Sequence, residues 1–143
     1  MKKIKNFRDL IAWQAASELV KDIANKFTKN FPKSEKYRLT DQIIRPSRSV
    51  PSQIAEGFRR SSLKDKYHFC EMGTTSGDET ENHLYDAFGN KYTDNKTYKH
   101  YLYRIIRVRL LLSRLTKSVR ELMTAHDNEP QPSCNNLYRI FTL

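Results

Sequence analysis

An arginine stripe with helical spacing is the feature of this sequence best suited to a chemical role, which is the binding of anions. At about 100° per residue, one side of a helix over residues 38–60 carries apolar and small side chains, namely Leu39, Ile43, Ser47, Val50, Ile54 and Phe58. The opposite side carries Arg38, Arg45, Arg48, Ser52 and Arg59, with Asp41 and Glu56 as the only nearby acids. Guanidinium groups bind phosphate oxygens, so the stripe predicts contact with a polyanion. The alternative is an ordinary solvated helix face, because arginine is also a good helix former.

Residue types that bind metals or act in catalysis do not form a recognisable site. His68, Cys70 and Glu71 cluster in the sequence, and Glu79 with His83 forms a helical i, i+4 pair. A zinc site needs three or four converging ligands, whereas Cys70 would lie nearly opposite Glu79 around a helix. The sequence also has no phosphate-binding glycine loop. We therefore expect no enzyme activity, no catalytic residue, no metal ion and no cofactor.

Composition indicates a basic, single-domain protein. The chain has 143 residues and a formal net charge of +10, which favours nucleic acid or an anionic surface as partner. Four glycines and five prolines are few for an all-β fold. No apolar run approaches the roughly 18 residues of a membrane span, and the basic N-terminus lacks the apolar stretch of a signal peptide. Two cysteines are too few for a disulfide framework, so we expect a cytoplasmic location.

Two helices are expected in the first 60 residues. The first covers about residues 9–28, with a predicted core stripe of Leu10, Trp13, Ala16, Val20, Ala24 and Phe27. The second carries the arginine stripe, and Ser34 is its expected N-cap. Pro46 and Pro51 each remove a backbone donor, so we expect this helix to persist through both with a bend.

The third helix is expected from Ser62 to about Phe88. Ser62 followed by Asp65 resembles a capping box, and Gly89–Asn90 is the expected C-cap. Gly73 and Gly77 lie four residues apart, which would let another backbone approach. This helix is acidic, whereas the second and fourth are basic.

The fourth helix begins near Thr93–Asp94 and has the cleanest periodicity. A coiled-coil-like seam runs through Tyr98, Tyr101, Ile105, Val108, Leu112, Leu115, Val119 and Leu122. Leu102, Ile106 and Leu110 form a second apolar line that the seam does not need, and we expect it to be an oligomer interface. Its basic residues extend the candidate nucleic-acid-binding set, which then comprises Arg38, Arg45, Arg48, Arg59, Arg60, Arg104, Arg107 and Arg114.

Short connections between four helices predict an all-α, antiparallel up-down-up-down four-helix bundle over residues 1–126. Residues 127–143 differ, since a linker-like stretch is followed by an isolated apolar peptide, Leu137–Leu143. Such a peptide is either disordered or docked on a neighbouring chain.

The sequence resembles a known family of four-helix bundles. The resemblance is carried by Phe7–Gln14, by Phe31–Pro32, by Arg48–Phe58 (Arg-Ser-Val-Pro-Ser-Gln-Ile-Ala-Glu-Gly-Phe), and by Ser76, Glu79, Glu81 and Leu84. These segments are similar to those of bacterial proteins encoded in intervening sequences of 23S rRNA genes. Related bundles include the accessory variability determinants (Avd) of diversity-generating retroelements. The resemblance implies a homopentameric ring with a basic surface and, in the Avd branch, association with a reverse transcriptase and its RNA.

The sequence therefore predicts a non-catalytic, oligomeric basic scaffold that binds RNA or DNA through backbone phosphates. The alternative is a purely protein-binding scaffold whose basic face meets an acidic partner. Binding of the fourth helix to a membrane surface is a third interpretation, but two apolar sides on that helix favour burial in protein.

Overall fold

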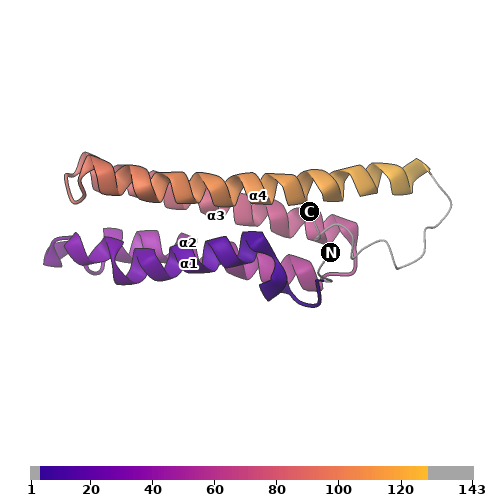
Figure 1. The fold of residues 1–143 in the computed structure, drawn as a ribbon, viewed down its shortest axis with the longest axis horizontal. Coiled ribbons are helices and arrows are strands. Elements are labelled where there is room, and N and C mark those ends of the chain that lie inside the picture. The colour runs from indigo at the N-terminus through magenta and orange to yellow at the C-terminus, as the bar shows by residue number, and fades with distance from the viewer. Residues whose placement is uncertain (1–3, 129–143) are drawn as a thin grey trace.

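The computed structural model describes residues 4–128, which contain four α-helices, three short 3-10 helices and no strand. The α-helices are α1 (Ile11–Asn25), α2 (Leu39–Arg59), α3 (Leu63–Gly89) and α4 (Asn95–Asn128) (Figure 1). The 3-10 helices are η1 (Phe7–Asp9), η2 (Phe27–Asn30) and η3 (Lys33–Glu35). The predicted all-α class is confirmed. The expectation for the apolar tail concerns residues beyond 128 and lies outside the described part of the chain.

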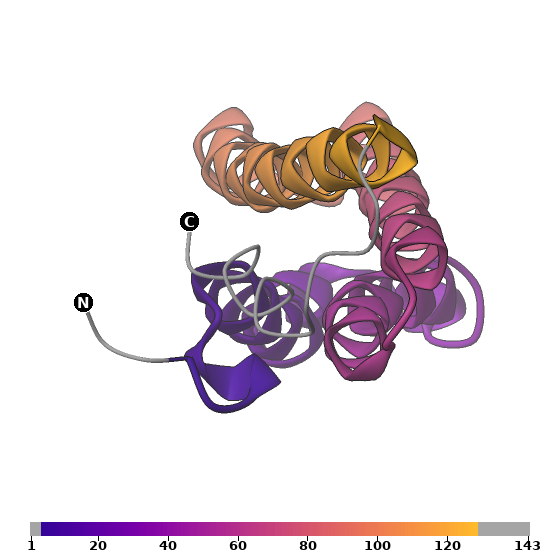
Figure 2. The same ribbon diagram turned by 90° about the vertical axis from the view of Figure 1, so that its right-hand side faces the viewer.

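The four helices pack around one core. Each helix contacts the next one in the sequence, and α1 also contacts α4. The α1–α4 contact is the least extensive of the four. End-on views show α2 and α4 diagonally across the core from each other (Figure 2). The outer faces of these two helices therefore point to different sides of the molecule.

Burial confirms the predicted core of α2 and α4 and corrects that of α1. On α4 the seam residues from Tyr101 to Val119 are buried, and on α2 those from Leu39 to Ile54 are buried. On α1, however, Trp13, Val20 and Ala24 are only half-buried. Alongside Leu10, Ala16 and Phe27, the buried positions are Ala12, Leu19 and Ile23. Both sets have helical spacing, so periodicity alone could not choose between them.

α2 continues through both of its prolines, as predicted. Pro46 is buried and Pro51 is half-buried, so their rings add packing area that offsets the backbone hydrogen bonds they cannot make. Because the helix is unbroken, the buried stripe and the arginine stripe stay on opposite faces along its whole length.

The helix ends follow the predictions in part. Ser62 Oγ accepts a hydrogen bond from the Asp65 N–H at 3.0 Å, and Asp94 Oδ1 accepts one from the Thr97 N–H at 2.6 Å. Ser34 does not cap α2, because it lies within η3. Instead, Glu35 Oε2 accepts from the Leu39 N–H at 3.1 Å. A carboxylate one turn upstream thus replaces the expected serine.

In the turn after α3, the residue with the left-handed backbone conformation lies just beyond the pair expected from the sequence. Asn90 is the C-cap, as predicted, but the left-handed position falls on Lys91, with φ of 61°. The Tyr92 N–H then donates to the Ala87 carbonyl at 2.9 Å, which closes the turn. This conformation is usual for glycine or asparagine and costs a lysine about 1 kcal/mol.

Gly73 and Gly77 of α3 face side chains rather than another backbone. A Cβ added at Gly73 would lie 3.5 Å from the Gln53 Cβ and from Leu112 Cδ1, which is an ordinary contact. Gly57 on α2 is tighter, because a Cβ there would lie 3.0 Å from the Phe69 Cβ. The need for glycine is therefore greater at Gly57 than at Gly73.

Two alanine substitutions test this packing. Gly73→Ala should raise the free energy of unfolding by about 0.5–1 kcal/mol, because alanine is the better helix former and finds room. Gly57→Ala should lower it by about 1 kcal/mol or more, because Phe69 must move. Urea unfolding measures both, and equal effects of the two substitutions would contradict the packing described here.

Candidate nucleic-acid interface

The arginine stripe of α2 lies on the solvent side of the bundle. Arg38, Arg45, Arg48 and Arg59 are all exposed, opposite the buried stripe of the same helix. None of the four forms an ion pair with another residue in the range 4–128. α2 has 21 residues, so at about 1.5 Å per residue the stripe is about 30 Å long. These positive charges are available to a partner.

Arg60, the fifth candidate near this helix, has local partners. Its guanidinium pairs with the exposed Glu56 carboxylate and lies 4.8 Å above the Phe69 ring centroid. This pairing also offsets the charge of Glu56, one of the two acids near the stripe. Arg60 therefore contributes less charge to a partner than the four unpaired arginines do.

Arg104 is engaged in tertiary structure. Its Nη1 lies 2.6 Å from Asp22 Oδ2 on α1, and its guanidinium lies 5.7 Å from the Tyr101 ring centroid. Hydrogen bonds from Lys26 and from Arg104 lower the pKa of the Asp22 carboxyl. Arg104 and Asp22 are far apart in the sequence, so no local signal could have shown that this arginine ties α4 to α1.

Arg107 and Arg114 are exposed on α4 and form no ion pair with a residue between 4 and 128. Since α4 lies diagonally across from α2, these two arginines do not extend the α2 stripe within one subunit. The eight predicted arginines thus divide into the α2 stripe, a separate α4 pair, and two that are paired with acids.

The predicted interface line on α4 is partly exposed. Leu102 is half-buried, Ile106 is 39% exposed and Leu110 is 58% exposed. Leu102 packs against the core, whereas Ile106 and Leu110 leave apolar surface exposed among the described residues. This apolar row is therefore available for contact with another chain.

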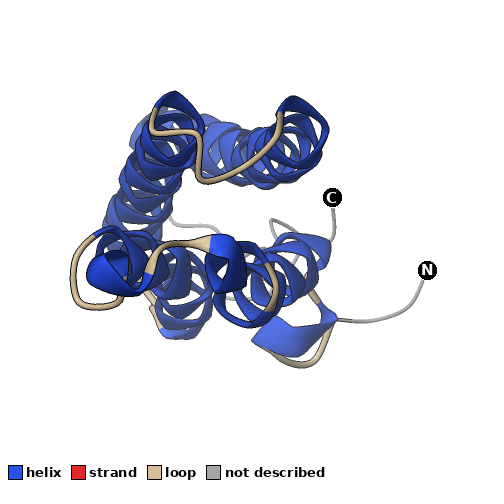
Figure 3. Cartoon of the chain, turned by 90° about the vertical axis from the view of Figure 1, so that its left-hand side faces the viewer, coloured by secondary structure: helices blue, strands red, loops and turns tan. Residues whose placement is uncertain are grey.

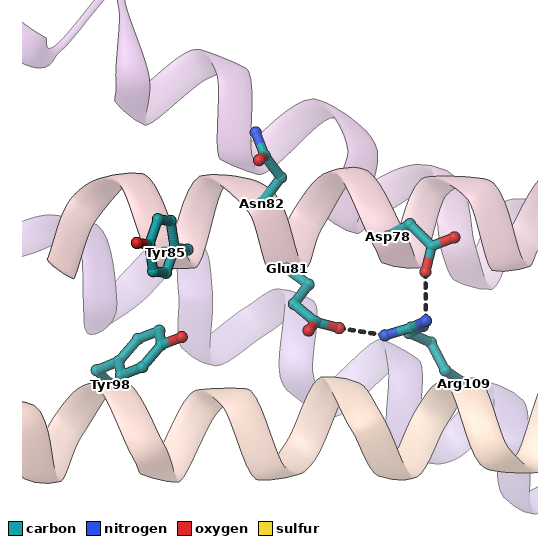
Figure 4. A pocket seen from close by; sticks show the side chains of 6 residues that line it. All are labelled: Asp78, Glu81, Asn82, Tyr85, Tyr98 and Arg109. Atoms are coloured by element: carbon teal, nitrogen blue, oxygen red, sulfur yellow. Dashed lines mark hydrogen bonds and ion pairs between the residues drawn. The ribbon is translucent and has the colours of Figure 1, made fainter. Parts of the chain in front are cut away.

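Arg109 lies beside this row and was not singled out by the sequence. It pairs with Asp78 and Glu81 of α3 in a shallow surface pocket that Asn82, Tyr85 and Tyr98 also line (Figure 4). The two ion pairs join α3 to α4, and they offset part of the acidic charge of α3.

Lys66 is a second residue whose role the sequence did not show. It is buried, and its Nζ donates to the carbonyls of Gly57 and Phe58 at 3.2 and 3.1 Å. Lys66 therefore caps the C-terminus of α2 from α3. A cation is stabilising at this position, because the C-terminal end of a helix carries partial negative charge. Burial lowers the pKa of the Lys66 amine.

The residues considered for metal binding or catalysis do not converge. Cys70 is buried, and burial raises the pKa of its thiol to about 11, while His68 and Glu71 are exposed. Across residues 4–128, no three side chains of the metal-binding types come together. In the same range, no helix has the length and apolar character needed to cross a membrane.

Residues 8–114 match the family described as 23S rRNA-intervening sequence protein. This segment includes α1, α2, α3 and the greater part of α4. Among curated proteins, none matches the chain.

The fold is similar to that of a crystal structure from Bacteroides thetaiotaomicron VPI-5482, a protein with unknown function from the S23 ribosomal protein family. The TM-score is 0.70 and the sequence identity is 19%. The match covers 75% of this chain and 96% of that chain. At this level of identity, the similarity shows a shared fold and nothing more.

Replacement of Arg104 tests whether this arginine stabilises the fold, unlike the arginines that face solvent. Arg104→Gln should lower the free energy of unfolding at pH 7 by about 1 kcal/mol. The folded-state pKa of Asp22 is lowered, so this stabilisation is present above about pH 4 and is lost as pH falls through that lowered value. The difference from the parent in urea unfolding should therefore shrink between pH 7 and about pH 3.

Arg107→Gln is the matched control. The Arg107 side chain is exposed, so its removal should change stability by less than about 0.5 kcal/mol at either pH. A loss as large as that of Arg104→Gln, or an Arg104→Gln effect independent of pH, would contradict this assignment.

Proposed function

Because this chain belongs to the family of 23S rRNA-intervening sequence proteins, we propose that it is a non-catalytic basic scaffold that binds RNA or DNA through backbone phosphates. The single observation that carries this proposal is the stripe of unpaired, exposed arginines on α2. A phosphate backbone offers a row of anions to such a stripe, and each contact releases condensed counterions. Contacts of this kind position a protein on nucleic acid without reading its sequence.

The acids near the stripe do little to offset its charge. Asp41 is half-buried near the start of α2, and Glu56 is paired with Arg60. The backbone of α2 is held at both ends, by Glu35 at the first turn and by Lys66 at the last carbonyls. The arginines are therefore presented on a fixed helix rather than on a loop, which lowers the cost of ordering them on binding.

Assembly is the second part of the proposal. The exposed line of Leu102, Ile106 and Leu110 on α4 is the contact through which antiparallel up-down-up-down bundles form a cyclic homo-oligomer, a pentamer by family resemblance. A ring repeats the α2 stripe once per subunit, so weak phosphate contacts add through effective concentration. In an Avd-like setting, the partners would be a reverse transcriptase and its RNA in the bacterial cytoplasm.

A purely protein-binding scaffold is the alternative function. The observation that favours it is the same exposed apolar line, since Ile106 and Leu110 suit a protein surface better than a phosphate backbone. In that case, the α2 arginines would meet an acidic protein, and nucleic acid would not bind even at low salt.

A triple substitution tests the phosphate contacts. Arg45→Gln, Arg48→Gln and Arg59→Gln together remove three positive charges from the exposed face and leave the buried stripe intact. Affinity for RNA should fall by a similar factor for all sequences, and the slope of log affinity against log salt should become shallower by about three for each subunit in contact. Fluorescence anisotropy over a salt series measures both quantities.

The matched control removes the same charge elsewhere. Lys5, Lys21 and Lys64 are exposed on other parts of the bundle and form no ion pair within residues 4–128. Their joint replacement by glutamine should change the slope much less. If the triple arginine variant binds RNA as the parent does, the stripe is only a solvated face. If the parent binds no RNA even at about 50 mM salt, the protein-scaffold alternative replaces this proposal.

The assembly has its own test. Ile106→Glu places a charge in the apolar line and should dissociate the oligomer while leaving the helix content unchanged, because Ile106 lies outside the core. Light scattering and circular dichroism measure the two effects. A parent protein that is already a monomer of 16.9 kDa at micromolar concentration would contradict the proposed ring.

A further inference from the structure

Two connections that are distant in the sequence meet at one end of the bundle. Tyr92, in the α3–α4 connection, donates its hydroxyl to Glu35 Oε1 in η3 at 3.2 Å. The Phe31 and Tyr92 rings also contact each other, with centroids 5.7 Å apart. In Figure 3 this end of the molecule faces the viewer. The α1–α2 and α3–α4 connections therefore form one continuous surface.

This surface, here called the basic end, is rich in lysine. The α1–α2 connection contributes exposed side chains at Lys29, Lys33, Lys36 and Arg38, and the segment after α3 contributes Lys91, Lys96 and Lys99. Across residues 4–128, no ion pair is formed by any of these seven. The positive charge of the basic end is thus available to an anion.

The two acids within the connections themselves are already hydrogen-bonded, whereas Asp86, in the last turn of α3, is exposed near Tyr92. Glu35 accepts hydrogen bonds from the Leu39 N–H and from the Tyr92 hydroxyl, so its carboxylate joins α2 to the α3–α4 connection. Asp94 caps α4, and the hydrogen bond from the Thr97 N–H lowers the pKa of its carboxyl. Both carboxylates are therefore committed to helix N-termini, where they offset partial positive charge of the backbone.

An exposed aromatic ring lies beside one of these lysines. Tyr37 is 78% exposed, and the ammonium of Lys36 lies 5.1 Å from its ring centroid. The 3-10 helix η3 and the hydrogen bond from the Arg38 N–H to the Glu35 carbonyl fix the backbone around Tyr37. The ring is thus held in solvent on an ordered segment, although it contributes little to the core.

The backbone conformation of Lys91 presents a further positive charge at this end. This residue adopts the left-handed backbone conformation although Gly89 and Asn90, which tolerate that conformation better, stand directly before it. Here the strain places a lysine at the tip of the turn beside Tyr92.

We propose that the basic end binds unpaired nucleotides of a single-stranded nucleic acid. Tyr37 stacks on one base, and the surrounding lysines contact the phosphates on either side. Stacking platforms beside positively charged grooves are how proteins hold single strands without reading their sequence. In a duplex the faces of the bases are covered by their neighbours, so Tyr37 has no base to stack on.

The site deepens the proposed function and rests on it. Arg38 belongs both to the basic end and to the start of the α2 stripe. A strand anchored at Tyr37 can therefore continue along α2 over Arg45 and Arg48. The basic end gives the scaffold a preference for single strands, which the arginine stripe alone does not supply.

An anionic membrane is the competing partner. A basic surface with an aromatic residue also suits lipid headgroups, but membrane-binding surfaces bury a continuous apolar face. At the basic end, Phe31 is buried and Tyr92 is half-buried. The exposed rings at or within about two turns of this end are single tyrosines on three different segments (Tyr37, Tyr85 and Tyr103). The observations favour nucleic acid.

The test compares single-stranded and duplex RNA of about 20 nucleotides, a length that exceeds a typical single-strand site. Tyr37→Ala should weaken binding of the single strand about 5- to 100-fold and leave duplex binding within about twofold. Tyr37→Phe keeps the ring and should bind as the parent does. Ile11→Ala removes an apolar side chain that is 58% exposed at the start of α1, at the opposite end of the bundle, and should have no effect.

The outcomes separate this proposal from the previous one. Parent-like binding of the single strand by Tyr37→Ala overturns the stacking site, and the α2 triple variant then decides whether phosphate binding itself stands. An equal loss for single strand and duplex also overturns the stacking site, because stacking requires unpaired bases. If Tyr37→Ala abolishes binding to vesicles containing phosphatidylserine and leaves RNA binding unchanged, the basic end is a membrane contact.

Discussion

The unbroken course of α2 through Pro46 and Pro51 determines which side chains face the core and which face solvent. A helix that ended at either proline would lose the fixed 100° step, and the arginines after it would no longer share a face with those before it. Burial of Ile43, Val50 and Ile54 on the inner side holds the helix in place despite the missing hydrogen bonds. The exposed position of the arginine stripe is therefore a consequence of core packing.

Charge is distributed unevenly around this frame. The outer side of α2 and the basic end are positive, whereas α3 carries Asp78 and Glu81, which Arg109 pairs from α4. Two further acids link elements of the fold, since Asp22 is bonded to Lys26 and Arg104, and Glu35 is bonded to Tyr92. Positive charge that no ion pair within the described residues offsets therefore gathers on the outer side of α2 and at the basic end. Such a surface steers a polyanion toward one side of each bundle.

The spacing of apolar and polar residues predicted the features that follow from the order of residues along a single helix. The α4 seam, both faces of α2 and the Ser62 cap all follow from spacings of three and four residues. Features that depend on packing between helices could not be predicted. The core stripe of α1 lies on Leu19 and Ile23 rather than on Val20 and Ala24, although both sets fit a helix.

The candidate site was predicted in part for the same reason. The α2 arginines are exposed as expected, but Arg104 meets an aspartate far away in the sequence, and Lys66 reaches back to the end of α2. The basic end escaped the sequence analysis entirely, because its lysines and Tyr37 come from two connections that only the fold brings together.

Arginine-specific chemical modification, mapped by mass spectrometry with and without bound RNA, tests the central claim most directly. We expect RNA to protect Arg45, Arg48 and Arg59, while Arg104 reacts slowly in both states because Asp22 holds its guanidinium. Equal modification of Arg45, Arg48 and Arg59 in the free and RNA-bound protein would contradict the account, since the phosphates would then lie on some other surface.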